Sequence, residues 1–348
     1  MTTTDPSPKV APIPEETTQH AVQSAFRWLE FGPLLFFALA ALALWWIWPK
    51  GHSGAVTTVT WSSNGFWIAS GGHDGKILLR NVAKKSIDRR LQVPFRKYKG
   101  IRVTSVRFRP RRQQLQAAYS NRQVVSWNSQ QWKWLSEKHF RNPVQRIRCS
   151  RRGGRCAFVS SRRVYLEHPQ PDRTKGLRLR IKSKGGFFSA SWSPDGSQLA
   201  VAGQGILRIY TMKKGAKPRL LKIKPTLLLQ DVAWSPDGRW IAAGGTDDLV
   251  RIWNASTGSL YKLFKGHYGA VTALAWSADN KQLASGDVNG DLWLWGLDKD
   301  GRKQRITGHE KRISDLQWHP SKPLFVSSSF DSTLRLWDAT TGKILQRW

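Results

Sequence analysis

The chain has 348 residues, with 56 Lys or Arg against 23 Asp or Glu, and its formal net charge is +33. Two cysteines exclude a small fold held together by a disulfide framework. The length exceeds one typical domain but still allows a single large β-barrel or propeller. A net charge of this size requires an anionic partner, an anionic surface or a cloud of counterions.

The excess positive charge lies in the middle of the chain. Residues 76–225 contain 38 Lys or Arg and only 5 Asp or Glu, whereas residues 226–348 contain 15 and 13, and residues 1–50 contain 3 and 4. The basic character therefore belongs to one part of the fold, and its position there decides which anionic partner it meets.

The first 50 residues predict a tail followed by a membrane span. Residues 1–25, rich in Thr, Pro, Glu and Gln, predict a disordered tail. Residues 26–50 predict a single transmembrane helix, because the 18 residues of 31–48 carry no charge. At about 1.5 Å per residue, this stretch would span about 27 Å, close to the hydrocarbon thickness of a bilayer. Trp45, Trp46 and Trp48 would anchor its end at the headgroup level.

A cleaved signal peptide is the main alternative to a retained anchor. The segment before the apolar run is long and acidic, and no A-x-A-like site follows Trp48, so a retained single-pass anchor is favoured. Arg27 and Lys50 flank the run and do not fix its orientation. The acidic tail before the run and the basic bulk after it favour a cytoplasmic C-terminal domain.

Residues 51–348 contain a repeated pattern, Val-x-x-Val-x-Trp-Ser-x-x-Gly, followed by a strand of small residues and an alternating strand that ends in Trp. Its period-two alternation, broken by turn sequences, predicts strands and hairpins. Stacking such sheets radially would cover both faces of each one. The aromatic position of the first strand falls in seven copies at Trp61, Phe108, Cys149, Trp192, Trp234, Trp276 and Trp318.

The repeat resembles the WD40 family, and its SPDG turns at 193–196 and 235–238 resemble those of bacterial, cyanobacterial-like members. Gly-His pairs at 51–52, 266–267 and 308–309, and the closing Trp337-Asp338, also match that family. The resemblance implies an all-β, seven-bladed WD40-type β-propeller over 51–348, preceded by the transmembrane helix. It implies the fold and says little about function.

In the WD40 family a buried His, Ser or Thr, Asp and Trp form a hydrogen-bonded tetrad within a blade. The last repeat supplies all four, as His309, Ser327, Asp331 and Trp337. His, Ser and Asp together also allow a hydrolase interpretation, but a catalytic Ser needs an exposed, strained turn. We therefore expect a structural role. The sequence has no Gly-rich phosphate loop and no metal-ligand spacing, so we expect no metal, no cofactor and no enzymatic activity.

Other repeats depart from this tetrad. The sixth has Asn289 where Asp is expected, the first has Arg80 in place of Trp, and the third and fourth have Glu167 and Tyr210 there. Since incomplete networks stabilise less, we expect the middle blades to be the least stable. Residues 343–348 supply the last outer strand locally, so we expect blade seven to hold blade one by face packing alone.

The two cysteines, Cys149 and Cys156, fall at core positions of adjacent predicted strands joined by SRRGGR. We favour small buried apolar side chains at both positions. A cross-strand disulfide or a redox switch is the alternative.

The basic residues of the first four blades fall in loops on both faces of the predicted ring. Loops that lead into each inner strand share a face with the loops joining the second and third strands. This membrane-proximal face would carry Arg96, Lys97, Lys99, Arg102, Arg122, Arg141, Arg162, Arg163, Lys182 and Lys184. The opposite face, predicted to bind a partner, would carry Lys84, Lys85, Arg111, Arg112, Arg151, Arg152, Arg155, Lys213, Lys214 and Lys217.

The short link after the predicted span suggests how these faces are used. Residues 49–54 reach at most about 20 Å when extended, so one basic face would meet the anionic lipid headgroups at about 1 kcal/mol per close charge. The other face implies an acidic protein partner. We therefore expect a docking scaffold, or a subunit or assembly factor of a membrane complex. The alternative is a tether for RNA or ribosomes, for which Trp132 and Trp134 form the one aromatic pair in the basic region.

Overall fold

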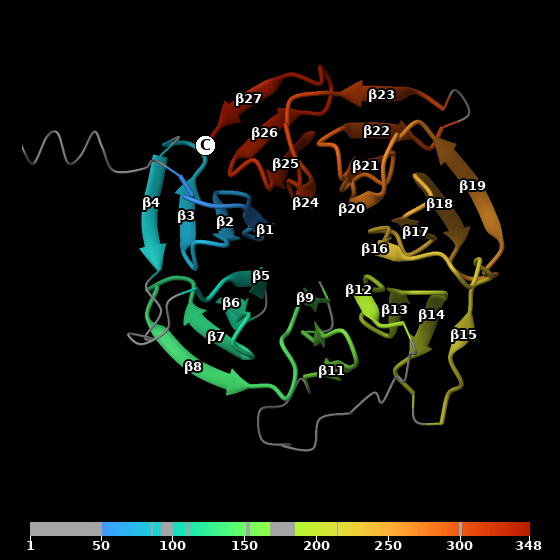
Figure 1. Ribbon diagram of the computed structural model, residues 1–348, viewed down its shortest axis with the longest axis horizontal. Coiled ribbons are helices and arrows are strands. Elements are labelled where there is room, and N and C mark those ends of the chain that lie inside the picture. Colours follow the sequence, from blue (N-terminus) through green and yellow to red (C-terminus); the bar gives the residue numbers. More distant parts are fainter. Residues whose placement is uncertain are drawn as a thin grey trace, which may run out of the picture. The chain divides into compact units, whose positions relative to one another are not determined.

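The computed structural model describes residues 51–84, 86–91, 100–109, 112–150, 154–167, 185–213, 215–298 and 301–348. The elements with assigned bounds in these ranges are 27 β-strands, which form seven sheets around a central axis (Figure 1). The predicted tail, the predicted span and its anchor residues Trp45, Trp46 and Trp48 lie outside the described residues. Within the described ranges, no helix has the length and apolarity needed to cross a membrane.

Each sheet is an antiparallel meander in chain order, which we number as blades one to seven. Blade one is β1 (Val56–Trp61), β2 (Trp67–Gly72), β3 (Ile77–Asn81) and β4 (Ser86–Leu91). Blade two is β5 (Val103–Arg109), β6 (Gln114–Tyr119), β7 (Gln123–Asn128) and β8 (Trp134–His139). Blade three has three described strands, β9 (Arg146–Cys149), β10 (Cys156–Val159) and β11 (Val164–Leu166).

The other four blades have four strands each. Blade four is β12 (Phe187–Trp192), β13 (Gln198–Gly203), β14 (Ile206–Thr211) and β15 (Arg219–Leu220). Blade five is β16 (Leu229–Trp234), β17 (Trp240–Gly245), β18 (Leu249–Asn254) and β19 (Leu260–Lys265). Blade six is β20 (Val271–Trp276), β21 (Gln282–Asp287), β22 (Leu292–Gly296) and β23 (Lys303–Ile306). Blade seven is β24 (Ile313–Trp318), β25 (Leu324–Ser329), β26 (Leu334–Asp338) and β27 (Ile344–Arg347).

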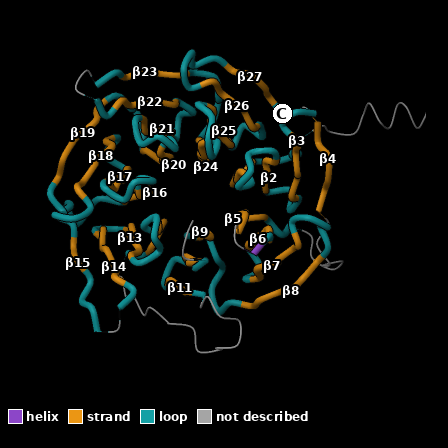
Figure 2. Tube along the Cα trace, turned by 180° about the vertical axis from the view of Figure 1, so that it is seen from behind, coloured by secondary structure: helices purple, strands orange, loops and turns teal. Residues whose placement is uncertain are grey.

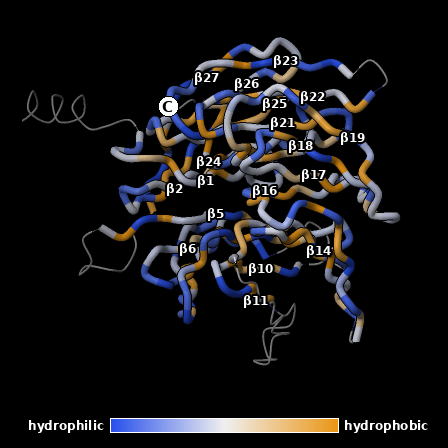
Figure 3. Tube along the Cα trace, turned by 45° about the vertical axis from the view of Figure 1, so that its right-hand side comes forward, coloured by the Kyte–Doolittle hydropathy of each residue, from blue (hydrophilic) through white to orange (hydrophobic). Residues whose placement is uncertain are grey.

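The first strand of every blade lies next to the axis, and the ring closes because β24 contacts β1. From behind, β4, β8, β15, β19, β23 and β27 form the rim (Figure 2). Figure 3 shows hydrophobic residues in many of the strands. β2 and β17 are each buried at five consecutive positions, as expected for a sheet with a neighbouring sheet on both faces. These observations confirm the predicted all-β, seven-bladed propeller.

Among the described strands, blades seven and one exchange none, and the outer strand β27 pairs with β26 of its own blade. Trp61 packs with Val326 in a hydrophobic cluster across this junction. Side-chain hydrogen bonds add to the packing: the Trp61 backbone N–H donates to Gln317 Oε1 at 2.6 Å, and Ser314 Oγ donates to the carbonyl of Val56 at 2.6 Å. The prediction of face packing alone was therefore incomplete.

The repeated Trp at the end of the inner strand ties neighbouring blades together. In four blades its indole N–H donates to the carbonyl of the residue that precedes the same repeat position in the previous blade. These bonds are Trp61 to Gln317 at 3.2 Å, Trp192 to Arg148 at 3.0 Å, Trp276 to Ala233 at 3.0 Å and Trp318 to Ala275 at 2.8 Å. Phe108 and Cys149 have no indole N–H, so the junctions that enter blades two and three lack this bond.

The tetrad of blade seven forms a directed chain of hydrogen bonds. Trp337 Nε1 donates to Ser327 Oγ at 2.8 Å, and Ser327 Oγ lies 2.6 Å from His309 Nε2. His309 Nδ1 lies 2.7 Å from Asp331 Oδ2, so its proton belongs on Nδ1 and Nε2 accepts the Ser327 hydroxyl proton. Burial lowers the pKa of His309, although the Asp331 carboxylate opposes that shift, so the ring is neutral at pH 7.

Blade six completes the same tetrad with a different acid from the one expected. His267 Nδ1 bonds Asp287 Oδ2 at 2.7 Å, while Ser285 Oγ bonds both His267 Nε2 at 2.6 Å and Trp295 Nε1 at 2.7 Å. The expectation that Asn289 breaks this network was wrong. Asp287, two residues earlier at the end of β21, supplies the carboxylate.

Blade one keeps its network around the substituted Arg80. His52 bonds Ser70 Oγ and Asp74 Oδ1, both at 2.9 Å, and Arg80 Nη1 donates to Ser70 Oγ at 2.7 Å. The guanidinium also lies 5.7 Å from the ring centroid of Trp348. Arg80 therefore takes over the donor role of the missing Trp.

The two cysteines form a disulfide between directly paired positions of β9 and β10. The Cα atoms of Cys149 and Cys156 are 4.0 Å apart. The favoured interpretation of two separate apolar side chains was therefore wrong, because the sequence showed that the residues face each other but not their oxidation state.

Blade three has Glu167 at the position where the tetrad has Trp. Its carboxylate Oε2 lies 2.8 Å from Arg109 Nη1, and this ion pair links blades two and three.

Candidate functional site

The described part of the membrane-proximal set lies in the loops where the sequence placed it. Arg102 and Arg141 precede inner strands, and Arg122, Arg162 and Arg163 lie between second and third strands, all of them exposed. None of these five has a carboxylate partner within 4 Å among the described residues. Arg96, Lys97, Lys99, Lys182 and Lys184 lie outside the described residues.

The opposite set is less uniformly exposed. Lys84, Lys213 and Lys217 are exposed, and Arg112 and Arg155 are half-buried. Arg155 Nη1 donates to the carbonyl of Gly196 at 3.3 Å, so it also links blades three and four. The remaining members of this set, Lys85, Arg111, Arg151, Arg152 and Lys214, lie outside the described residues.

The aromatic pair proposed for nucleic-acid stacking is split by the fold. Trp134 begins the outer strand β8 and is 54% exposed. Trp132 packs edge-on against Trp67 and Phe108, with ring centroids 5.8 and 6.3 Å away, in the core between blades one and two. Trp132 is half-buried, so its ring is less accessible to a base than that of Trp134.

Two pockets lie between the inner strands, near their opposite ends, and we call them the wider and the narrower mouth of the central channel. The wider mouth has a volume of about 470 Å³ and is lined by the ends of all seven inner strands, including the repeated aromatic positions. The narrower mouth, about 230 Å³, is lined by residues near the starts of inner strands and lies on the membrane-proximal face. Arg148 and Asp315 line both mouths.

Five charged side chains within the inner strands of four blades line this channel, and none of them was predicted as a site from the sequence. They are Arg107, Arg146, Arg148, Asp231 and Asp315. They lie one or three residues before the repeated aromatic position, where other blades have Ser, Thr, Ala or Gln. Aligning the repeats at these positions would have revealed charges inside strands that otherwise carry small or apolar residues.

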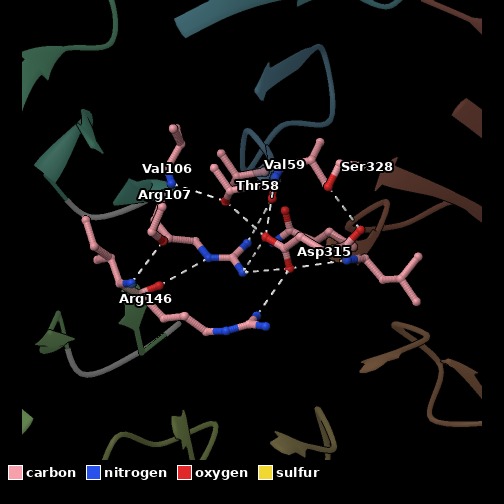
Figure 4. Close-up of polar contacts among 12 residues, drawn as sticks. Thr58, Val59, Val106, Arg107, Arg146, Asp315 and Ser328 are labelled. Carbon is pink, nitrogen blue, oxygen red and sulfur yellow. Dashed lines mark hydrogen bonds and ion pairs between the residues drawn. The ribbon is translucent and has the colours of Figure 1, made fainter. Parts of the chain in front are cut away.

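Asp315 is the most heavily bonded of the five (Figure 4). Its Oδ2 accepts hydrogen bonds from Thr58 Oγ1 at 3.0 Å and the Val59 backbone N–H at 3.3 Å, and Arg107 Nη2 lies 3.3 Å away. Burial alone would raise the pKa of Asp315, but the surrounding arginines, Arg107 first, lower it below its usual range. The carboxylate is therefore charged at neutral pH and joins blades seven, one and two.

Asp231 plays the equivalent part on the other side of the channel. It accepts hydrogen bonds from Ser189 Oγ at 2.5 Å and the Leu274 backbone N–H at 2.9 Å. Arg146 Nη1 and Arg148 Nη2 lie 3.7 and 3.6 Å from Asp231 Oδ1. Asp231 of blade five thus links blades four and six through its hydrogen bonds. The two arginines that approach it both come from blade three.

Positive charge exceeds negative charge inside the channel. Three arginines face two aspartates, and Arg146 Nη1 also lies 4.0 Å from Asp315 Oδ1. Burial, followed by repulsion from Arg107 and Arg146, lowers the pKa of Arg148 to about 9, so it stays charged at neutral pH. The described residues contain no group of three or more His, Cys, Asp or Glu side chains that could hold a metal ion.

The first and last blades of the ring match the same family model. Residues 47–81 and 301–338 match the WD domain, G-beta repeat, and residues 177–315 match the first beta-propeller of IFT140. Among solved structures, the Cps50 (Swd1) beta-propeller domain of Myceliophteria thermophila is similar, with 18% identity and a TM-score of 0.68 over 82% of this chain and 98% of that chain. A search of curated proteins by sequence found no match. The chain is a seven-bladed β-propeller that contains WD40 repeats.

Proposed function

We propose that this WD40-repeat propeller is a non-enzymatic docking protein, held at a membrane by residues 31–48 and working as a scaffold, subunit or assembly factor of a membrane complex. The WD40 propeller fold is consistent with a protein-interaction scaffold. The observation that carries the proposal is the charge distribution, with 38 Lys or Arg against 5 Asp or Glu in residues 76–225.

Two further observations support a membrane-facing and a partner-facing side. The exposed arginines of the membrane-proximal face lack carboxylate partners among the described residues, so they are available to anionic headgroups. The exposed lysines of the opposite face, Lys84, Lys213 and Lys217, would meet an acidic protein surface. The propeller would lie on the cytoplasmic side.

Tethering of RNA or ribosomes is the second candidate, because clustered Lys and Arg bind any phosphate backbone. The packing of the half-buried Trp132 against Trp67 and Phe108 makes one of the two stacking rings less available to single-strand recognition. The docking proposal is therefore favoured over RNA binding.

The anchor is tested by placing a charge in the apolar run of the full-length protein. Leu39→Arg should release the protein from the membrane pellet after an alkaline wash, because a charge at the centre of a span costs about 2.5–3.5 kcal/mol. Leu345→Arg, at an exposed position of β27, is the matched control and should leave the pellet unchanged. Retention of Leu39→Arg in the pellet would contradict the proposed span.

A further inference from the structure

The two mouths of the channel differ in charge. The wider mouth is lined by two arginines and two aspartates, so its charge is balanced. The narrower mouth is lined by Arg146, Arg148 and Arg312 but by a single carboxylate, that of Asp315. An anion that enters the channel would therefore be bound at the narrower mouth.

The guanidinium groups at the narrower mouth have hydrogen-bonding capacity that the described protein does not use. Each guanidinium has five N–H donors. Arg146 donates one hydrogen bond, to the Thr272 carbonyl at 3.3 Å, and Arg148 donates one, to the Ile147 carbonyl at 3.3 Å, among the described residues. Their ion pairs with aspartates are 3.6 to 4.0 Å long, well beyond the ~2.7–2.9 Å of a charge-assisted hydrogen bond.

Arg312 brings a third guanidinium to this mouth from blade seven. Its Nη2 donates to Gln230 Oε1 at 3.2 Å, and its guanidinium lies 5.9 Å from the ring centroid of Phe330. Burial, followed by repulsion from Arg146, lowers its pKa. The positive charges at this mouth therefore repel one another, and a bound anion would relieve that repulsion.

The size of the narrower mouth limits what can bind there. Its volume of about 230 Å³ is below the ~300–1,000 Å³ of ordinary ligand pockets. It accommodates one small oxyanion or one headgroup. Three guanidinium groups suit an anion with several oxygen acceptors, such as a phosphate.

Exposed aromatic rings on the same face point to a lipid as the source of that phosphate. Tyr268, in the loop that leads into β20, is 77% exposed, and Phe330, in the loop between β25 and β26, is 37% exposed and lines the mouth. Aromatic rings beside cationic side chains are typical of surfaces at the level of lipid headgroups. The exposed arginines Arg102 and Arg141 lie in loops of this face.

We infer that the narrower mouth of the channel binds the phosphate of an anionic phospholipid headgroup through Arg146, Arg148 and Arg312, with Tyr268 and Phe330 at the headgroup level. This inference rests on the proposed membrane attachment and adds a specific lipid site to it. The two fail separately, because the Leu39→Arg wash tests the anchor without involving the channel.

The test is equilibrium binding of a water-soluble lipid to the full-length protein in non-ionic detergent, measured by calorimetry. The probe is dihexanoyl-phosphatidylglycerol, and inorganic phosphate is the comparison. Arg312→Gln and Arg146→Gln should each weaken binding of the lipid about tenfold or more, since each loses hydrogen bonds to a charged group. Lys217→Gln removes the same charge from an exposed site on the opposite face and should change the affinity less than about twofold.

The aromatic residues offer a second matched pair. Phe330→Ser should weaken binding of the lipid probe, whereas Phe66→Ser, at a 63% exposed position between β1 and β2 on the opposite face, should not. If Arg146→Gln fails to fold, the half-buried Arg312 and the exposed Phe330 carry the test. The inference is overturned if the three arginine and lysine variants lose affinity equally, or if inorganic phosphate binds as tightly as the lipid.

Discussion

Substituting Ser327 by Ala tests the hydrogen-bond chain of blade seven. The Ser327 hydroxyl is fully buried and serves two partners, because it accepts the Trp337 indole N–H at 2.8 Å and donates to His309 Nε2 at 2.6 Å. Alanine fills nearly the same space but leaves both partners without a bond. The experiment therefore measures the effect of losing the two hydrogen bonds with little change in packing.

The size of the effect follows from these two orphaned groups. A buried donor or acceptor left unpaired costs about 1–3 kcal/mol, so the variant with two such groups should lose about 2–6 kcal/mol of unfolding free energy. Adding Trp337→Phe removes the orphaned donor. The double variant should therefore be less destabilised than the sum of the single variants, by about 1 kcal/mol.

The assay is urea unfolding of the full-length protein, followed by tryptophan fluorescence. Ser321→Ala, at an exposed position of the same blade, is the matched control and should stay within about 0.5 kcal/mol of the parent. A Ser327→Ala variant as stable as this control would show that the two hydrogen bonds of Ser327 do not stabilise the fold. Strictly additive losses of stability in the double variant would show that Trp337 and Ser327 are not coupled through their hydrogen bond.

Three further predictions concern pH, the disulfide and the blade junctions. Burial lowers the pKa of His52 and His309 below the ordinary 6.5, so the folded state binds fewer protons than the unfolded state. The unfolding free energy measured in urea should therefore fall as the pH is lowered from 7 to 5. A constant unfolding free energy over this range would contradict the prediction. Reducing the disulfide of Cys149 and Cys156, which are seven residues apart, should cost about 2–3 kcal/mol, and an unchanged urea midpoint with dithiothreitol would oppose it. Trp318→Phe should cost about 1–3 kcal/mol through the lost bond to a buried carbonyl, and a loss under 0.5 kcal/mol would show that the bond is dispensable.

The fold was predictable from the sequence because each copy of the repeat forms one sheet of the propeller. The aromatic position marks the end of each inner strand, and in four blades its indole N–H fastens one blade to the previous one. In those four blades the bond requires the Trp at a fixed place in the repeat, so the spacing of the aromatic position locates the inner strands. The local pairing of β27 with β26 was predictable for the same reason.

Contacts that depend on how far a side chain extends, and not on its position in the repeat, were harder to predict. Asp287 replaces the expected acid of blade six because its side chain reaches His267 from a position two residues away. The five inner-strand charges of the channel come from four blades and lie together only when the ring closes. Spacing placed Cys149 opposite Cys156 but could not show their oxidation state. The stability order of the blades stays a prediction.

The most direct test of the docking account is affinity purification of the full-length protein in mild detergent, with and without nuclease, followed by identification of the chains that copurify. The account predicts a stoichiometric set of membrane-protein subunits that survives nuclease treatment. Ribosomal proteins that disappear with nuclease would contradict it, because the basic blades would then hold RNA.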